Sequence, residues 1–392
     1  MSGTQPKRQL RLITTRPAKY IGPVKVEDEF SKHAGLIDET GLAKTTKVGE
    51  KTGEFPKTKI NEVRCGNTTY RIIREIAEDR VYQVVDNKTG KEGILKVIDV
   101  EEDHVRARTK REAGILKTLA GRGTAKILGE GVLPDRRAFI ILEKIDGKTY
   151  NEYFNLEQDG KCNKLSFNER MRIAMELAKA IGELHARGIY HRDLKPENVI
   201  VTKEGKVAII DFGIAKREED GKLTLIGMTL GTVAYLPPEQ LGIRDGYKLH
   251  PSADIYAAGM MLFETAFLRR VDFARSAKGA YGILEAKTKG TIFSDAEMNL
   301  LDWPDFARGP RVNYDSLDYE RRISKIELGG EERLDQEMRA REEQIDKWLH
   351  INPTDDPQTI LGKIIYKCTE VEPRRRYQAT GALIADLRRI AF

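Results

Sequence analysis

Short hydrophobic runs rich in Ile, Val and Tyr follow one another in the first half of the chain, with polar turns between them. The runs occupy residues 70–75, 80–86, 92–100, 125–132 and 137–143. Runs of this length and composition are typical of β-strands, and polar segments containing Asn or Gly that separate them are typical of turns. Between the third and fourth runs, apolar residues recur near helical spacing. The pattern therefore predicts five antiparallel strands and one helix.

After residue 146 the hydrophobic period becomes mainly helical. Ser166-Phe-Asn-Glu169 is a capping box, and it opens a long helix whose apolar stripe continues to Leu184. A strongly apolar helix follows at 253–267, and two closing helices follow at 357–369 and 377–390. The sequence thus predicts an α+β protein with a small antiparallel β lobe at 68–146 and a large, mainly α-helical lobe at 147–391.

Two segments depart from this pattern. Residues 1–67 have few clustered apolar residues and begin with a basic stretch, which predicts a flexible arm. This arm could also dock an acidic partner or act as a weak organelle presequence. The second segment is a charged helical insert at 272–353, in which the apolar residues of 334–349 lie on one narrow face. It is either an interaction insert or a helix packed on the large lobe.

Composition narrows the class of protein. The 392 residues exceed one average domain, and the net charge of +6 is too small to indicate a nucleic-acid partner. Cys65, Cys162 and Cys368 lie far apart, which fits neither a zinc site nor a disulfide framework and favours a reducing, cytoplasmic compartment. No apolar run approaches the ~18 residues of a membrane span, and the first residues resemble no secretory signal.

The candidate chemistry lies in two short blocks, His191-Arg-Asp-Leu-Lys-Pro-Glu-Asn198 and Asp211-Phe-Gly213. A carboxylate at Asp193 is suited to orient an incoming hydroxyl and accept its proton. Asn198 and Asp211 supply oxygen ligands of the kind that Mg²⁺ prefers. Together the two blocks predict a phosphoryl-transfer site.

The blocks resemble those of Hanks-type serine/threonine protein kinases of the bacterial style, and the resemblance covers about residues 68–391. It implies a soluble, two-lobed kinase that uses ATP and Mg²⁺, with Mn²⁺ as an alternative, to phosphorylate protein hydroxyls. Its own activation loop would be among the substrates. By the same resemblance, Lys195 neutralises the transferred phosphoryl group, and Arg192 pairs with a phosphorylated activation loop.

A lysine and a glutamate complete the catalytic set by resemblance. Lys96 occupies the lysine position of the family's Val-Ala-Ile-Lys block and would contact the α- and β-phosphates. Glu112 is the glutamate chosen to hold Lys96, because Leu116 follows one turn later on the same face. Glu101 and Glu102 are weaker rivals, since both precede the apolar stripe.

The resemblance also implies residues that line the nucleotide site and support it. The adenine would lie against the hinge at Glu143 and Ile145, with Ile200 beneath and Leu142 as gatekeeper, and Val81 would also contact the nucleotide.

The supporting residues lie around the peptide-binding segment and the activation loop. By the same resemblance, Gly213 would complete the Asp-Phe-Gly block, Asp254 would brace the catalytic loop, and Thr224 and Thr229 would be activation-loop phosphosites. The last supporting contact would be a buried ion pair between Glu239 and Arg376. Arg374 and Arg375 precede Arg376 directly, so the sequence alone leaves open which of the three arginines pairs with Glu239.

The glycine-rich loop of the family is missing. Arg74, Ile76 and Asp79 stand at its three glycine positions, where a Cβ would keep the backbone away from the phosphates. Two interpretations follow: an active kinase with altered ATP binding, or a pseudokinase that serves as a scaffold. The first is favoured because Asp193, Asn198 and Asp211 are all present, and turnover distinguishes the two.

Overall fold

The computed structural model describes residues 60–77, 80–98, 112–135, 137–156, 163–212, 230–241, 252–271, 287, 293–308 and 331–391. The arm before residue 60 lies outside the described residues, as do Asp79, Glu101, Glu102, Gly213, Thr224 and Thr229. Within the predicted insert, 272–353, most residues from 272 to 330 lie outside the described residues too.

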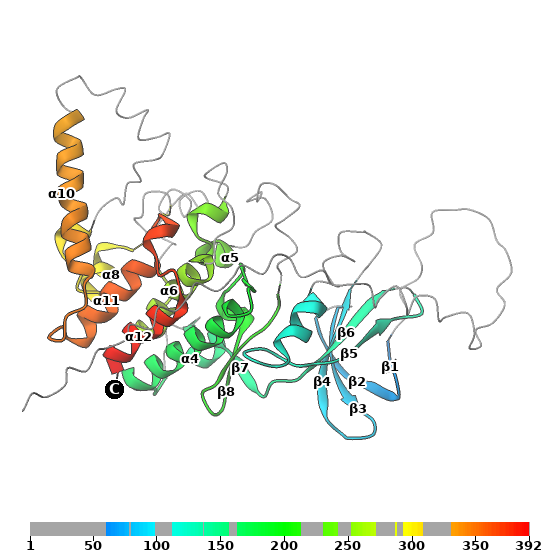
Figure 1. The fold of residues 1–392 in the computed structure, drawn as a ribbon. Helices are drawn as coiled ribbons and strands as arrows, with labels where there is room; N and C mark the ends of the chain where they lie inside the picture. Colours follow the sequence, from blue (N-terminus) through cyan, green and yellow to red (C-terminus); the bar gives the residue numbers. More distant parts are fainter. Residues whose placement is uncertain are drawn as a thin grey trace, which may run out of the picture. The chain divides into compact units, whose positions relative to one another are not determined.

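The small lobe is built on one antiparallel sheet of six strands in the order β1-β2-β3-β4-β6-β5 (Figure 1). The strands are β1 (Glu62–Cys65), β2 (Thr68–Ala77), β3 (Val81–Asp86), β4 (Glu92–Ile98), β5 (Ile127–Val132) and β6 (Ala138–Glu143). Both faces of β6 are buried: Phe139 and Ile141 pack in a core within the small lobe, whereas Ile140 and Leu142 join the larger core. A strand that is buried on both faces has a continuous apolar sequence, and residues 138–142 of β6 have one.

The sheet has six strands rather than the predicted five, because β1 lies within residues assigned to the arm. Gly66 joins β1 to β2 with a positive φ of 56°, which glycine adopts without strain. Val63 is buried in the small-lobe core, and the Cys65 thiol donates a hydrogen bond to the carbonyl oxygen of Glu130 on β5 (3.4 Å). A strand of four residues with one core side chain carries too little pattern to be predicted, so the lobe begins near residue 60 and not at 68.

One helix of the small lobe is described at 112–119. Ala113, Leu116 and Leu119 on it are buried in the larger core, which continues into the large lobe. The apolar face predicted at helical spacing therefore packs inward, and it fixes the direction in which Glu112 points.

The large lobe contains a second antiparallel sheet and a group of packed helices. The sheet has the order β7 (Gly147–Thr149), β8 (Val199–Thr202), β9 (Val207–Ile209). The α-helices are α3 (Tyr150–Phe154), α4 (Phe167–His185), α5 (Leu230–Tyr235), α6 (Ser252–Phe267), α8 (Asp295–Leu300), α10 (Glu331–Leu349), α11 (Pro357–Cys368) and α12 (Thr380–Ala391). Short 3₁₀ helices lie at Pro196–Asn198, Pro238–Leu241, Asp305–Ala307 and Pro373–Arg375. The helices α4, α6, α11 and α12 pack against one another (Figure 1).

Two helices show how sequence pattern and burial correspond. The capping box predicted at the start of α4 is formed, with Ser166 and Glu169 each accepting a hydrogen bond from the other's backbone N–H. All residues of α6 from Ser252 to Ala266 are buried, as expected for a helix that is apolar on every side. This central helix supports the catalytic loop.

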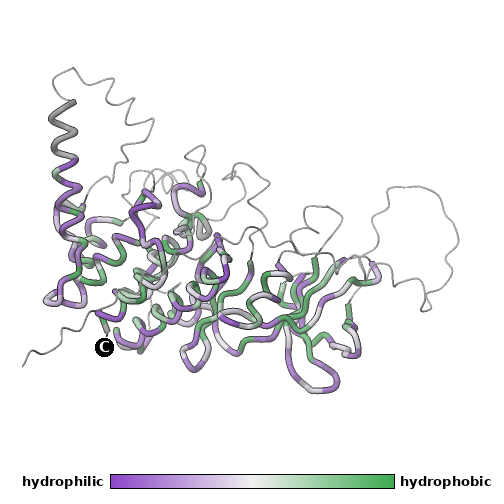
Figure 2. Tube along the Cα trace, viewed as in Figure 1, coloured by the Kyte–Doolittle hydropathy of each residue, from purple (hydrophilic) through white to green (hydrophobic). Residues whose placement is uncertain are grey.

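The sequence of α10 is rich in charged residues, and the part of the helix that Figure 2 colours is mainly hydrophilic. Near its end Ile345 is buried, and Trp348 and Leu349 pack against the larger core. The last turns of α10 are therefore packed on the large lobe, as one of the two interpretations of the insert expected. Among the described residues, no helix is both long and apolar enough to span a membrane.

Candidate active site

The catalytic loop is held by a buried carboxylate in the first turn of α6. Asp254 is 1% exposed and accepts hydrogen bonds from the backbone N–H groups of His191 (2.9 Å) and Arg192 (2.7 Å). The His185 ring Nε2 also lies 2.8 Å from Asp254 Oδ2. Burial acts to raise the pKa of Asp254, but the pKa stays below its usual value because His185, His191 and the Arg192 amide stabilise the carboxylate. The predicted brace is present in the structure.

Asp193 lies with Lys195 and Asn198 at the centre of this loop. Lys195 Nζ is 3.4 Å from Asp193 Oδ2, and Asn198 Nδ2 donates to the Asp193 carbonyl oxygen (2.9 Å). Because its nitrogen is turned toward Asp193, the buried Asn198 amide presents its oxygen in the other direction. Arg192 has a positive φ of 64°, which is uncommon for a residue other than glycine and indicates a constrained loop.

Lys96 on β4 joins the small lobe to the Asp-Phe-Gly block. Its Nζ lies 3.4 Å from Glu112 Oε1 and 3.2 Å from Asp211 Oδ1. Burial alone would lower the pKa of Lys96, but the two carboxylates outweigh it and hold the pKa above its usual value. Lys96 is therefore a firmly charged ammonium group. The structure brings together the lysine and the glutamate that the sequence paired.

Asp211 follows β9 and is placed beside the catalytic loop by the backbone. Ile210 N–H donates to the Asn198 carbonyl oxygen (2.8 Å), so the β8–β9 hairpin returns Asp211 to the vicinity of Asn198. Asp211 has a positive φ of 61°, and about half of its side chain is exposed. The next residue, Phe212, is buried with its ring centroid 5.2 Å from that of His191.

Asn198 and Asp211 fit a divalent cation that binds phosphate oxygens. They offer one amide oxygen and one carboxylate, and a hard cation prefers oxygen ligands and commonly takes only one or two carboxylates from the protein. Among the described residues no cluster of three His, Cys, Asp or Glu side chains could hold a metal alone. The donor set thus suits a cation shared with a phosphate-bearing substrate.

The predicted lining of the nucleotide site comes from both sheets. Val81 on β3, Ile145 and Ile200 on β8 are half-buried, and the proposed gatekeeper Leu142 is buried in the larger core. Glu143 is exposed, and its N–H donates to the Lys126 carbonyl oxygen (2.8 Å).

The segment at the missing glycine positions is a paired strand. β2 pairs with β3 as far as Ala77, with irregular register between Ile72 and Arg74 and again between Glu75 and Ala77. The Arg74 guanidinium donates to the Gln83 side chain (2.8 Å), and Ile76 is 47% exposed. Side chains therefore occupy positions where the family's glycines carry none.

The segment that the resemblance assigns to peptide binding is fixed by a buried ion pair. Arg376 binds both carboxylate oxygens of Glu239, with distances of 2.7 and 2.8 Å. Arg376 is 1% exposed, whereas Arg374 is exposed and Arg375 contacts Asp346 on α10 and Glu370. The structure thus places Arg376, and neither neighbouring arginine, against Glu239.

A polar network beside this segment was not predicted. Glu264 on α6 is 2% exposed and accepts a hydrogen bond from the Tyr235 hydroxyl (2.7 Å). Burial raises the pKa of Glu264 to about 7, although Arg270 and Tyr235 oppose the shift. Arg270 contacts Tyr235, Asn151 (2.9 Å) and Glu197 of the catalytic loop (3.4 Å). The position of Glu264 inside the apolar run of 253–267 was the available signal.

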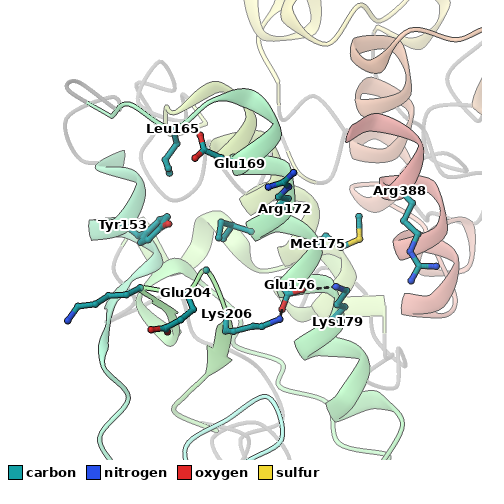
Figure 3. Close-up of a pocket in the computed structure, with 13 residues that line it drawn as sticks. Tyr153, Leu165, Glu169, Arg172, Met175, Glu176, Lys179, Glu204, Lys206 and Arg388 are labelled. Atoms are coloured by element: carbon teal, nitrogen blue, oxygen red, sulfur yellow. Dashed lines mark hydrogen bonds and ion pairs between the residues drawn. The ribbon is translucent and has the colours of Figure 1, made fainter. Parts of the chain in front are cut away.

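A separate hollow on the large lobe contains none of the predicted site residues. It has a volume of about 510 Å³ and lies between α4, the turn between β8 and β9, and Arg388 of α12 (Figure 3). Inside it, Glu176 pairs with Lys179 (2.6 Å) and Lys206 (3.1 Å), so much of its charge is internally compensated.

Comparison with known proteins agrees with this geometry. The family model described as "Protein kinase domain" matches residues 77–386, most of the chain. The chain belongs to this family. The resemblance to Hanks-type kinases and the expected two-lobed fold are thereby confirmed.

Bacterial serine/threonine kinases are among the relatives. The chain is 36% identical over 202 residues to the probable serine/threonine-protein kinase PknB of Lactococcus lactis, covering 50% of this chain and 31% of that protein. It is 29% identical over 215 residues to the serine/threonine-protein kinase PknA of Mycobacterium tuberculosis, covering 51% and 47%. The chain therefore spans less than half of either relative.

Proposed function

We propose that this protein is an ATP-dependent serine/threonine protein kinase. The observation that carries the proposal is the contact of Lys96 with both Glu112 and Asp211, next to a catalytic loop in which Asn198 is turned toward Asp193. These groups meet the three needs of phosphoryl transfer: a cation for the phosphates, oxygen ligands for a metal, and a carboxylate for the hydroxyl.

Each residue has a role that follows from its surroundings. Lys96 is a charged group suited to bind the α- and β-phosphates, and Glu112 holds it in place. Asn198 and Asp211 would hold Mg²⁺, or alternatively Mn²⁺, which when bound neutralises charge on the phosphates. Asp193 orients the substrate hydroxyl and accepts its proton, while Lys195, 3.4 Å away, lies where it can offset charge on the transferred group.

A protein substrate is favoured by the support around the peptide-binding segment. Small-molecule phosphotransferases share the pattern of Asp193, Asn198 and Asp211. The segment of Glu239, which pairs with Arg376, and the segment of Asp254 resemble protein kinases more specifically. We include phosphorylation of Thr224 and Thr229 in the proposal, with Arg192 as the partner of the phosphate. Further protein partners on the N-terminal arm or the insert belong to the same proposal.

A pseudokinase that acts as a scaffold is the second candidate. The observation in its favour is β2, where the Arg74 and Ile76 side chains occupy two of the glycine positions. Such a strand weakens the contact between backbone and phosphates. It leaves Lys96, Asn198 and Asp211 unaffected, so an active enzyme with weaker ATP binding remains the better explanation.

The deciding measurement is turnover. Purified protein incubated with γ-labelled ATP and Mg²⁺ should transfer label to itself or to a generic protein substrate, and mapping should find label on Thr224 or Thr229. An Asp211→Asn variant serves as the inactive reference, because it removes a charged metal ligand. Wild-type protein that binds ATP but transfers no label to any protein would support the scaffold instead.

Glu112→Gln should lower kcat/KM for ATP by about tenfold to a hundredfold, the order expected when a catalytic group is misplaced. The amide keeps the volume but removes one of the two carboxylates that position Lys96. Steady-state kinetics with ATP as the varied substrate test this, with Glu183→Gln on the exposed surface of α4 as a control. Equal kcat/KM in the two variants would show that Glu112 does not position Lys96.

A further inference from the structure

One lysine outside the described catalytic set is completely buried. Lys287 is 0% exposed and lies within the 272–353 stretch predicted as an insert. Its Nζ donates hydrogen bonds to the carbonyl oxygens of Ala234 (2.7 Å) and Leu236 (2.6 Å). It also lies 3.3 Å from the Tyr256 hydroxyl on α6. A residue of the insert stretch therefore binds the backbone of a segment about fifty positions earlier.

The two carbonyls belong to the end of a helix and to the bend that follows it. α5 ends at Tyr235, and the last carbonyls of a helix have no partners within it. Here they are buried, so leaving them unsatisfied would be costly. A cation at a helix C-terminus is also favoured by the direction of the peptide dipoles. The Lys287 amino group supplies the hydrogen-bond donor for both carbonyl oxygens.

Lys287 lies next to the anchor of the same segment. The Tyr256 ring has Lys287 Nζ 4.6 Å from its centroid and the Arg376 guanidinium carbon 4.9 Å from it. Arg376 in turn binds Glu239, three positions after Leu236. Residues 234–239 are thus held at one end by Lys287 and at the other by Arg376, with Tyr256 between the two cations.

Keeping an ammonium group at this position has an electrostatic cost. Burial, together with the charge of Arg376, lowers the pKa of Lys287 well below its usual value, and Glu239 only partly opposes this. An apolar side chain of similar size would avoid that cost but could not donate to the carbonyls. The hydrogen bonds to the carbonyl oxygens of residues 234 and 236 are what the lysine amino group contributes.

We propose that Lys287 is a positioning residue that holds the peptide-binding segment, 230–241, in the conformation that binds protein substrate. The inference rests on the proposed kinase function and adds a residue of the insert stretch to it. Lys287 contacts the segment through the backbone carbonyls of Ala234 and Leu236, and neither residue belongs to the catalytic set. Its loss should therefore weaken binding of the protein substrate more than binding of ATP or the chemical step.

The test compares Lys287→Met with Lys363→Met. Lys363 is a matched control, because it is also buried (4% exposed) and also donates to a backbone carbonyl, that of His350 (2.9 Å), but in another part of the large lobe. The readouts are KM for myelin basic protein as a generic substrate, KM for ATP, kcat, and amide hydrogen exchange in 230–241.

Lys287→Met should raise KM for the protein by about tenfold or more, the order expected when buried carbonyl oxygens lose their hydrogen-bond donor, with KM for ATP nearly unchanged. Its 230–241 amides should exchange faster than in the wild type, whereas those of Lys363→Met should not. Lys287→Gln, which keeps a donor, should be intermediate and replaces the methionine variant if that variant does not fold.

Unchanged exchange in 230–241 together with an unchanged KM for the protein would overturn the inference. Equal changes of exchange and of KM for the protein in Lys287→Met and Lys363→Met would also overturn the inference, since they would reflect only general destabilisation. Wild-type protein without any transfer to protein would instead contradict the proposed function. In that case the exchange measurement alone would still decide whether Lys287 holds the segment.

Discussion

Asp193→Asn is expected to reduce phosphoryl transfer by about 10²- to 10⁴-fold, the usual contribution of a positioned acid–base group. Asparagine has nearly the same size, and its oxygen can still accept a hydrogen bond. It loses the negative charge that orients the substrate hydroxyl and takes its proton. The Asp193 carbonyl oxygen, to which Asn198 donates, is unaffected by the substitution. Binding of a nonhydrolysable ATP analogue should therefore remain within about threefold of wild type, below the tenfold change that 1.4 kcal/mol represents.

The measurement is kcat with a generic protein substrate beside the dissociation constant of the analogue. Asp146→Asn is a suitable control, because Asp146 also pairs with a lysine, Lys203 at 3.0 Å, but on the exposed surface. Surface pairs contribute little, so this variant should behave as wild type. Activity of Asp193→Asn near that of Asp146→Asn would mean that another group accepts the proton.

The catalytic loop could be predicted because its chemistry is local in the sequence. Asp193 and Asn198 are five positions apart, and the β8–β9 hairpin returns the chain directly to Asp211 through the hydrogen bond from Ile210 to Asn198. The prediction of Glu112 as the partner of Lys96 required one more step. The buried face of its helix had to be chosen from the spacing of the apolar residues. That choice places Glu112 next to Lys96, as the structure shows.

Buried charges were harder to predict, because a charged side chain is by default expected at the surface. Glu264 and Lys287 are separated in sequence from their partners Tyr235 and Leu236. The apolar run around Glu264 is a local sign of its burial, whereas Lys287 is not flanked by such a run. The three consecutive arginines 374–376 posed a related problem. Only packing distinguishes Arg376, which is buried, from the exposed Arg374.

Short elements were missed for a different reason. β1 has four residues and one core side chain, so its stability comes from pairing with β2 and from contact with β5 rather than from its own pattern. By contrast, α6 and α4 are long and carry either a continuous apolar run or a complete stripe with a capping box. Their existence followed from sequence, and the position of β1 followed only from tertiary structure.

Arg376→Met is expected to lower the free energy of unfolding by about 3–5 kcal/mol, the range for breaking a buried ion pair from one side. The substitution leaves Glu239 buried without its bidentate partner. It also removes donors from the carbonyl oxygens of Glu370 (2.7 Å) and Val371 (3.1 Å). Urea unfolding, followed by tryptophan fluorescence and circular dichroism, measures the loss.

Two further variants separate the ion pair from a general effect of losing an arginine. Arg374→Met removes an exposed arginine two positions away and should change stability by less than about 0.5 kcal/mol, as surface substitutions usually do. Combining Arg376→Met with Glu239→Gln should cost less than the sum of the two single changes, because the second removes the uncompensated carboxylate. If the two effects simply add, or if Arg374→Met destabilises as much as Arg376→Met, the pair is not what fixes the peptide-binding segment.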